Sequence, residues 1–205
     1  MAHADRPDWR ELGLLFGLGA GNVAIDLFGL PKTPLVVGGA LLWAIYLAAR
    51  LRRDPGALRA WGLRADNLRP AAREAAAVTL PLAAAMTAFG FARGHLPPPP
   101  GFWLILALYP AWGLAQNFLL NAVLARNLRA ALPERSVVAL SALLFSLSHA
   151  PDLPVMALTL LVAPGWLVLY RRHPNLWVLG VAHGLLGTLA FFAVLGRDVL
   201  QALLG

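Results

Sequence analysis

Five side chains able to take part in chemistry lie within otherwise apolar segments of the chain. Three are amides, Gln116, Asn117 and Asn121, which follow one another in the string Gln-Asn-Phe-Leu-Leu-Asn. The other two are His149 and His183, in later hydrophobic segments. Because an apolar environment makes every buried polar group costly unless it is hydrogen-bonded, this set of residues predicts a site.

Taken alone, each of these residues also has a structural interpretation. A single Asn or Gln in a membrane helix usually makes an interhelical hydrogen bond of about 1 kcal/mol, and a lone histidine can do the same. Ionisable residues inside a membrane are nevertheless functional candidates by default. Five polar groups that converge favour a common functional pocket over five separate structural contacts.

Composition predicts the elements that must position these side chains. Of 205 residues, 59% are hydrophobic and only 13% are charged, and the mean hydropathy is +0.66, which indicates an all-α, polytopic membrane helix bundle in a single transmembrane domain, 1–205. Seven helices are predicted, at about 12–30, 34–49, 75–92, 101–125, 136–151, 154–170 and 175–196. The fifth and sixth of these are short, and could form one bent pair around Pro151 and Pro154.

Depth in the bilayer supports convergence of the five groups. Counted at 1.5 Å per residue from the nearest cytoplasmic arginine, Gln116 lies about 15 Å and Asn121 about 7 Å into the membrane. By the same count His183 lies at most about 16 Å and His149 about 21 Å deep. These depths span less than half of the bilayer core, so we expect a polar intramembrane pocket.

Two helical features should shape this pocket. Tyr109-Pro110 removes a backbone donor and should bend the fourth helix just before the amides. In the seventh helix Gly180, Gly184 and Gly187 form a small-residue face that allows close approach of a neighbouring helix. Close packing there would bury the adjacent histidine.

The net charge of +7 reflects membrane topology. With the N-terminus in the cytoplasm, 14 of the 17 cationic residues fall on the inner side and only Lys32, Arg93 and Arg197 on the outer side, as the positive-inside rule expects. No nucleic-acid partner is therefore predicted. The Arg-rich loop 50–73 is a candidate for binding anionic lipid headgroups, with a short helix along the membrane surface.

The ratio of 16 Arg to one Lys fits a bacterial inner-membrane protein. The absence of cysteine excludes thiolate chemistry.

The order and spacing of the polar residues resemble the CPBP family of membrane proteases. That family includes the type II CAAX prenyl endopeptidases and bacterial bacteriocin-processing or immunity relatives, and its motifs are Glu-Glu-x-x-x-Arg, Phe-x-x-x-His and His-x-x-x-Asn or Asp. The second motif is intact here as Phe145-Ser-Leu-Ser-His149, and the third keeps His183 but has Gly187 where Asn or Asp belongs. The resemblance covers about residues 101–195.

The first motif keeps its spacing and loses its charges. Gln116 and Asn117 stand where the two glutamates belong, and Asn121 where the arginine belongs. In the family a glutamate with a histidine is thought to activate water for attack on a peptide bond, and the last histidine and Asn help to stabilise the oxyanion. An amide cannot take up that proton. The resemblance therefore implies His149 as base, Gln116 and Asn117 as groups that orient water or the scissile carbonyl, and His183 as oxyanion donor.

Three hypotheses remain open from the sequence. The first is an intramembrane peptidase of altered chemistry, acting on a membrane-embedded or lipidated peptide. The second is a pseudoenzyme that binds a peptide or protein partner as a chaperone, immunity or assembly factor. The third makes His149 and His183 metal ligands with Asp26 or a water, although Asp26 is more simply a cap at the outer end of the first helix. Two histidines without a nearby carboxylate are few for a metal, so no metal or cofactor is expected.

Overall fold

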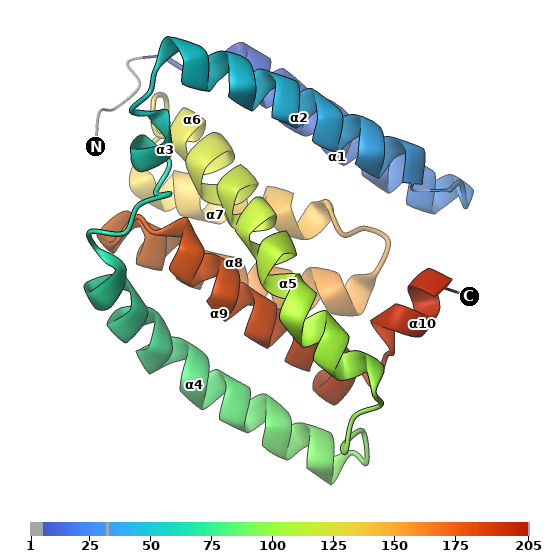
Figure 1. The fold of residues 1–205 in the computed structure, drawn as a ribbon. Helices are drawn as coiled ribbons and strands as arrows, with labels where there is room; N and C mark the ends of the chain where they lie inside the picture. Colours follow the sequence, from blue (N-terminus) through green and yellow to red (C-terminus); the bar gives the residue numbers. More distant parts are fainter. Residues whose placement is uncertain (1–5, 32, 205) are drawn as a thin grey trace. The chain divides into compact units, whose positions relative to one another are not determined.

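The computed structural model describes residues 6–31 and 33–204, and the regular elements in these ranges are all helices (Figure 1). The predicted all-α fold is confirmed. Lys32, one of the three cations expected on the outer side, lies outside the described residues. The helices are α1 (Trp9–Phe28), α2 (Thr33–Arg53), α3 (Ala57–Ala60), α4 (Leu68–Ala92), α5 (Gly101–Asn117), α6 (Arg126–Leu128), α7 (Glu134–Leu147), α8 (Leu153–Arg172), α9 (Leu176–Leu189) and α10 (Val199–Leu204), with π-helical segments at Phe118–Ala125 and Ala190–Val194.

Within the described residues, six helical segments are long and apolar enough to cross a membrane. They confirm the predicted polytopic bundle, because each is at least 18 residues long and contains a predominantly apolar stretch of the length that a span requires. The segments are Trp9–Phe28, Thr33–Arg53, Leu68–Ala92, Gly101–Leu128, Leu153–Arg172 and Leu176–Val194.

Several predicted boundaries are wrong. The segment expected at 136–151 is α7, whose 14 residues reach only about 21 Å, so it is too short to cross the bilayer. The third span begins at Leu68 rather than 75 and the second continues to Arg53, because both helices run past their apolar stretch into polar sequence. The surface helix predicted in the loop between them has only the four residues of α3.

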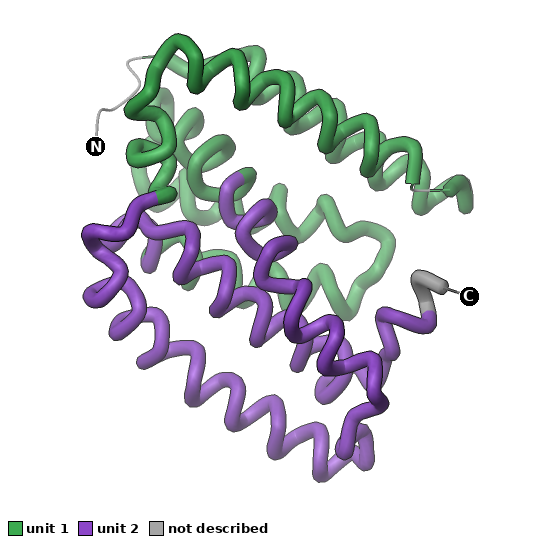
Figure 2. Tube along the Cα trace, viewed as in Figure 1, with its two compact units in different colours: residues 1–63, 119–168 green, residues 64–118, 169–205 purple. Residues whose placement is uncertain are grey.

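The chain divides into two compact units (Figure 2). Unit 1 contains the described residues up to 63 together with 119–168, and unit 2 contains residues 64–118 and 169–204. Unit 1 therefore holds α1, α2, α3, α6, α7 and most of α8, and unit 2 holds α4, α5, α9 and α10.

Unit 2 is built on the close packing of α5 against α9. A Cβ atom added at Gly113 would lie 2.8 Å from the carbonyl oxygen of Gly180, and one added at Gly184 would lie 2.6 Å from the backbone nitrogen of Pro110. The predicted small-residue face on α9 is therefore in use, with α5 as its neighbour. At the start of α9, the Asn175 side chain accepts from the Val178 N–H and donates to the Arg64 carbonyl, which fixes where the helix begins.

Unit 1 is held at one end by a buried carboxylate. Glu11, whose side chain is 1% exposed, pairs with Arg126 and accepts hydrogen bonds from Asn127 at 2.7 Å and from the Tyr46 hydroxyl at 2.5 Å. Asn127 in turn accepts from the backbone N–H of Asp8 at 2.6 Å. Because a buried charge is tolerated when it is paired and hydrogen-bonded, this network joins α1 and α2 to α6.

Candidate functional site

In unit 2 the structure brings together Asn117, the last residue of α5, and His183 in the middle of α9. The Asn117 amide nitrogen lies 3.1 Å from His183 Nδ1 and 2.9 Å from the Gly113 carbonyl oxygen. Asn117 is 1% exposed and His183 is partly buried. A residue of the altered first motif is thus bonded directly to the histidine of the third motif.

The hydrogen-bond partners of Asn117 fix the orientation of its amide and the tautomer of His183. A carbonyl oxygen only accepts, so the atom facing Gly113 must be the amide nitrogen, and this fixes the orientation of the Asn117 amide. The second hydrogen on that nitrogen points to His183 Nδ1, which therefore accepts. In the neutral imidazole the proton is then on Nε2, and His183 presents Nε2–H as a donor.

Glycine on α9 allows this contact. Gly180 lies about one turn before His183 and Gly184 directly after it, and a side chain at either glycine would collide with Leu114 or Pro110 of α5. At Gly187, where the family motif has Asn or Asp, an added Cβ would overlap the ring of Tyr109. Tyr109 also lies beside His183, with ring centroids 6.3 Å apart. An aromatic ring of α5 therefore occupies the space next to the histidine that the motif's amide or carboxylate would enter.

In unit 1, His149 lies just beyond the end of α7, where the chain turns toward α8. Its Nδ1 is 2.8 Å from the Phe145 carbonyl oxygen, and the two rings pack edge to face with centroids 5.0 Å apart. The two residues of the intact Phe-x-x-x-His motif therefore contact each other directly. Asn22 of α1 donates to the Ser148 carbonyl at 3.1 Å and holds this turn in place.

His149 has the opposite tautomer to His183. Because the Phe145 carbonyl can only accept, Nδ1 carries the proton, and in the neutral imidazole Nε2 is the acceptor nitrogen. A histidine in this state can take up a proton at Nε2, as a general base does. His149 and His183 therefore differ in what their Nε2 atoms present, an acceptor in the first and a donor in the second.

The remaining two amides lie at the junction of α5 with the π-helical segment that follows it. Gln116 is partly buried in α5, and Asn121 is fully buried in the segment Phe118–Ala125. Single π-turns inside α-helices often occur at functional sites. Here the π-helical geometry sets in directly after Asn117, so it changes the direction of the side chains that follow the first motif residues.

The five predicted residues are distributed over both units. Asn117 and His183 meet within unit 2, which also contains Gln116, whereas Asn121 and His149 belong to unit 1. Convergence of all five on one pocket stays a prediction. In the part of the chain that the structure describes, no three His, Asp or Glu side chains gather as metal ligands.

One expectation about an individual residue needs revision. The cap at the end of α1 is Gly29, in a left-handed conformation with φ 62°, and Asp26 contributes its backbone carbonyl to the Gly29 N–H. Sequence reasoning also missed the buried Glu11, because its position among the charges before the first span resembles an ordinary cytoplasmic flank. Its partner Asn127, two residues beyond the predicted span, carried no pattern that pointed to it.

Comparison with known proteins bears on the segment that carries all five predicted residues. Residues 97–189 match the family model described as "Type II CAAX prenyl endopeptidase Rce1-like". This segment is similar to that family, and it is called the Rce1-like domain below. Searches of curated proteins and of solved structures each gave no match. The resemblance inferred from the three motifs is confirmed, and the chain is a multi-pass membrane protein with a CAAX-protease-like domain.

Proposed function

We propose that the Rce1-like domain is an intramembrane peptidase of altered chemistry, which cleaves a membrane-embedded or lipidated peptide with a histidine as its base. The observation that carries this proposal is the hydrogen bond from Asn117 to His183. A position that has lost its carboxylate still holds a motif histidine in a defined orientation and tautomer. That supports a remodelled site over an abandoned one, in which Leu or Ala would suit the apolar surroundings better.

In the proposed reaction each histidine acts through its Nε2 atom. His149 Nε2 takes a proton from water, and the resulting hydroxide adds to the scissile carbonyl carbon. His183 Nε2–H donates to the oxyanion that forms, while Asn117 acts as a positioning residue for His183. The His149 imidazolium then gives its proton to the leaving amine as the carbon–nitrogen bond breaks.

Gln116 is assigned to orient the attacking water, since an amide can donate and accept but cannot serve as the base. Asn121 is assigned to the wall of the predicted polar intramembrane pocket. The proposal requires His149 and His183 to face one peptide bond. Because removal of a positioned catalytic group slows a reaction by about two to four orders of magnitude, a peptidase without the family's glutamates should be slow.

The experiment is reconstitution of the full-length protein into liposomes with a prenylated or transmembrane peptide library, followed by mass spectrometry of the products. We expect cleavage by the wild type, loss of about a hundredfold or more in His149→Ala, and unchanged cleavage in His173→Ala. His173 is a matched histidine control, because it pairs with Glu74 at the end of α8. Cleavage by His149→Ala at the wild-type rate would refute the proposal.

A second candidate is a catalytically silent binder of a peptide or protein partner, as a chaperone, immunity or assembly factor. It is favoured by the loss of all three charges of the first motif at Gln116, Asn117 and Asn121. Such a protein would retain a peptide in the reconstituted system, form no product, and release the peptide on Asn117→Leu. If the triple variant Gln116→Glu, Asn117→Glu and Asn121→Arg gained cleavage that the wild type lacks, the binder would be the better description.

A further inference from the structure

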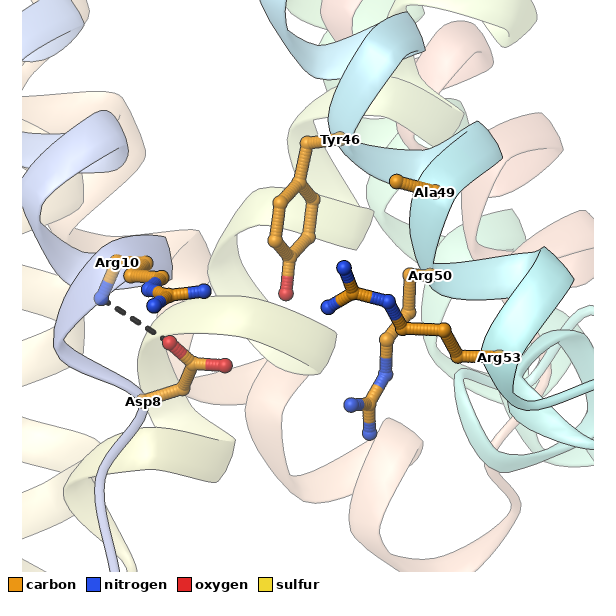
Figure 3. A pocket seen from close by; sticks show the side chains of 6 residues that line it. All are labelled: Asp8, Arg10, Tyr46, Ala49, Arg50 and Arg53. Atoms are coloured by element: carbon orange, nitrogen blue, oxygen red, sulfur yellow. Dashed lines mark hydrogen bonds between the residues drawn. The ribbon is translucent and has the colours of Figure 1, made fainter.

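Outside the Rce1-like domain, unit 1 contains a pocket of about 200 Å³ between the beginning of α1 and the end of α2 (Figure 3). This is smaller than the roughly 300–1,000 Å³ that enclose drug-sized ligands, so the pocket suits one compact chemical group. Its lining residues are Asp8, Arg10, Tyr46, Ala49, Arg50 and Arg53.

The charge of the lining selects an anion. Three guanidinium groups, from Arg10, Arg50 and Arg53, face one carboxylate, that of Asp8. Asp8 Oδ1 already accepts from the backbone N–H of Arg10 at 3.0 Å and so caps α1. Guanidinium forks match the oxygens of phosphate in pairs. Three of them around a compact space are therefore suited to a phosphate group.

Among the polar groups near the pocket, the arginines are the donors that can bind an anion. The Tyr46 hydroxyl donates to Glu11 at 2.5 Å, so its hydrogen is already in use. Arg50 Nε is buried and has no hydrogen-bond acceptor among residues 6–31 and 33–204. The Arg50 pair with Asp54 is long, at 3.9 Å, and both side chains are 40% or more exposed. The exposed terminal nitrogens of Arg50, which Asp54 holds only weakly, can therefore contact a ligand.

The surroundings of the pocket indicate which phosphate it takes. Along α2, Leu41, Leu42 and Ile45 are 59%, 51% and 67% exposed, as expected of side chains that face lipid tails. The apolar stretch of α2 ends at its basic last turn, where the pocket lies. A phospholipid could place its phosphate among the arginines and lay its acyl chains along α2, whereas free phosphate would use only the arginines.

We propose that this pocket binds the phosphate of an anionic membrane lipid. Basic pockets between transmembrane helices on the cytoplasmic side are known to hold anionic headgroups, and each Arg or Lys near such a surface contributes about 1 kcal/mol, or roughly fivefold in affinity. The lipid would clamp the ends of α1 and α2 next to the Glu11 network. The proposal concerns residues outside 97–189 and does not depend on the proteolytic one.

The test uses the full-length protein in detergent, titrated with phosphatidylglycerol or phosphatidylcholine and followed by native mass spectrometry. We expect preferential retention of phosphatidylglycerol, weakened at least about tenfold in the triple variant Arg10→Gln, Arg50→Gln and Arg53→Gln. The matched control, Arg52→Gln, Arg69→Gln and Arg73→Gln, makes the same change in net charge with exposed arginines outside the pocket and should bind as the wild type does.

A second variant tests the pocket without changing its charge. Ala49→Phe fills the space between the arginines and should weaken phosphatidylglycerol retention while thermal stability stays near that of the wild type. Equal loss in the control triple, or wild-type retention in Ala49→Phe, would overturn the proposal. Displacement of phosphatidylglycerol by low millimolar inorganic phosphate would assign the arginines to free phosphate and contradict the lipid assignment.

Discussion

At the scale of single residues, the contact between Asn117 and His183 defines the chemistry of unit 2. The sequence predicted both residues because polar groups are rare in membrane helices, and the two motifs gave their spacing. Their hydrogen bond could not be predicted, since it depends on the Gly113 carbonyl that orients the amide. The sequence did not predict the Glu11 network either. A charged residue near a helix end has the same sequence pattern whether its side chain is solvated or buried.

The contact can be tested with Asn117→Asp. A carboxylate has no hydrogen to give, and a carboxylic acid has one, so the variant can satisfy at most one of the two acceptors, the Gly113 oxygen or His183 Nδ1. We expect a loss of about 1–3 kcal/mol in unfolding free energy and a change in the ¹⁵N signals of the His183 ring. The control, Gln116→Glu, adds the same charge about 100° around the helix and should leave those signals in place; an unshifted spectrum in Asn117→Asp would argue against the contact.

At the scale of elements, the fit of α5 against α9 depends on glycine. The spacing of Gly180, Gly184 and Gly187 predicted a close neighbour, but the partner helix and the place of Tyr109 follow only from three-dimensional packing. Helix boundaries were less predictable than helix identities, because α2 and α4 continue into polar sequence. The π-helical segment after Asn117 had no sequence signal.

Gly184→Ala tests this helix packing. The added methyl would lie 2.6–2.7 Å from backbone and ring atoms of Pro110, so α5 and α9 must separate. We expect a loss of about 1–3 kcal/mol, measured by thermal unfolding in detergent, together with a weaker contact at His183. Gly165→Ala in α8 is the matched control, since an added Cβ there meets nothing within 4 Å and should be neutral or stabilising by up to about 1 kcal/mol. Equal effects of the two substitutions would contradict the proposed packing.

The Glu11 network predicts an asymmetry between ion pairs. Arg126→Met removes the partner of a carboxylate that is 1% exposed, and breaking such a buried pair typically costs about 3–5 kcal/mol. Arg172→Met breaks the pair with Glu74, in which the arginine side chain is 64% exposed, and should cost less than about 1 kcal/mol. Chemical denaturation of the two variants provides the comparison. A similar loss in both would mean that Glu11 is not held as the structure indicates.

At the scale of the whole molecule, composition alone predicted a multi-pass helical membrane protein. The motifs predicted a CPBP-like segment at about 101–195, which overlaps the family match at residues 97–189. Orientation in the membrane rests on charge counting and stays a prediction, as does the bacterial inner membrane. Of the seven predicted segments, the one at 136–151 is not among the six candidate spans of the described residues, because α7 is only 14 residues long.

Orientation can be measured directly because the chain has no cysteine. Arg93→Cys follows α4 and Ala65→Cys precedes it, and both positions are exposed. With the N-terminus in the cytoplasm, we expect a membrane-impermeant maleimide to label Arg93→Cys in intact cells and Ala65→Cys only after lysis. The reverse pattern would place the N-terminus outside.

The most direct measurement asks whether the two motif histidines face one chamber, as the proposed peptidase requires. In the otherwise cysteine-free chain, the pair His149→Cys and His183→Cys is treated with a short bismaleimide beside the control pair His149→Cys and Val181→Cys. Val181 is 62% exposed on the same helix, about 200° around it from His183. We expect efficient crosslinking of the first pair and little of the second. Crosslinking of the control pair alone, or of neither pair, would contradict a shared intramembrane site.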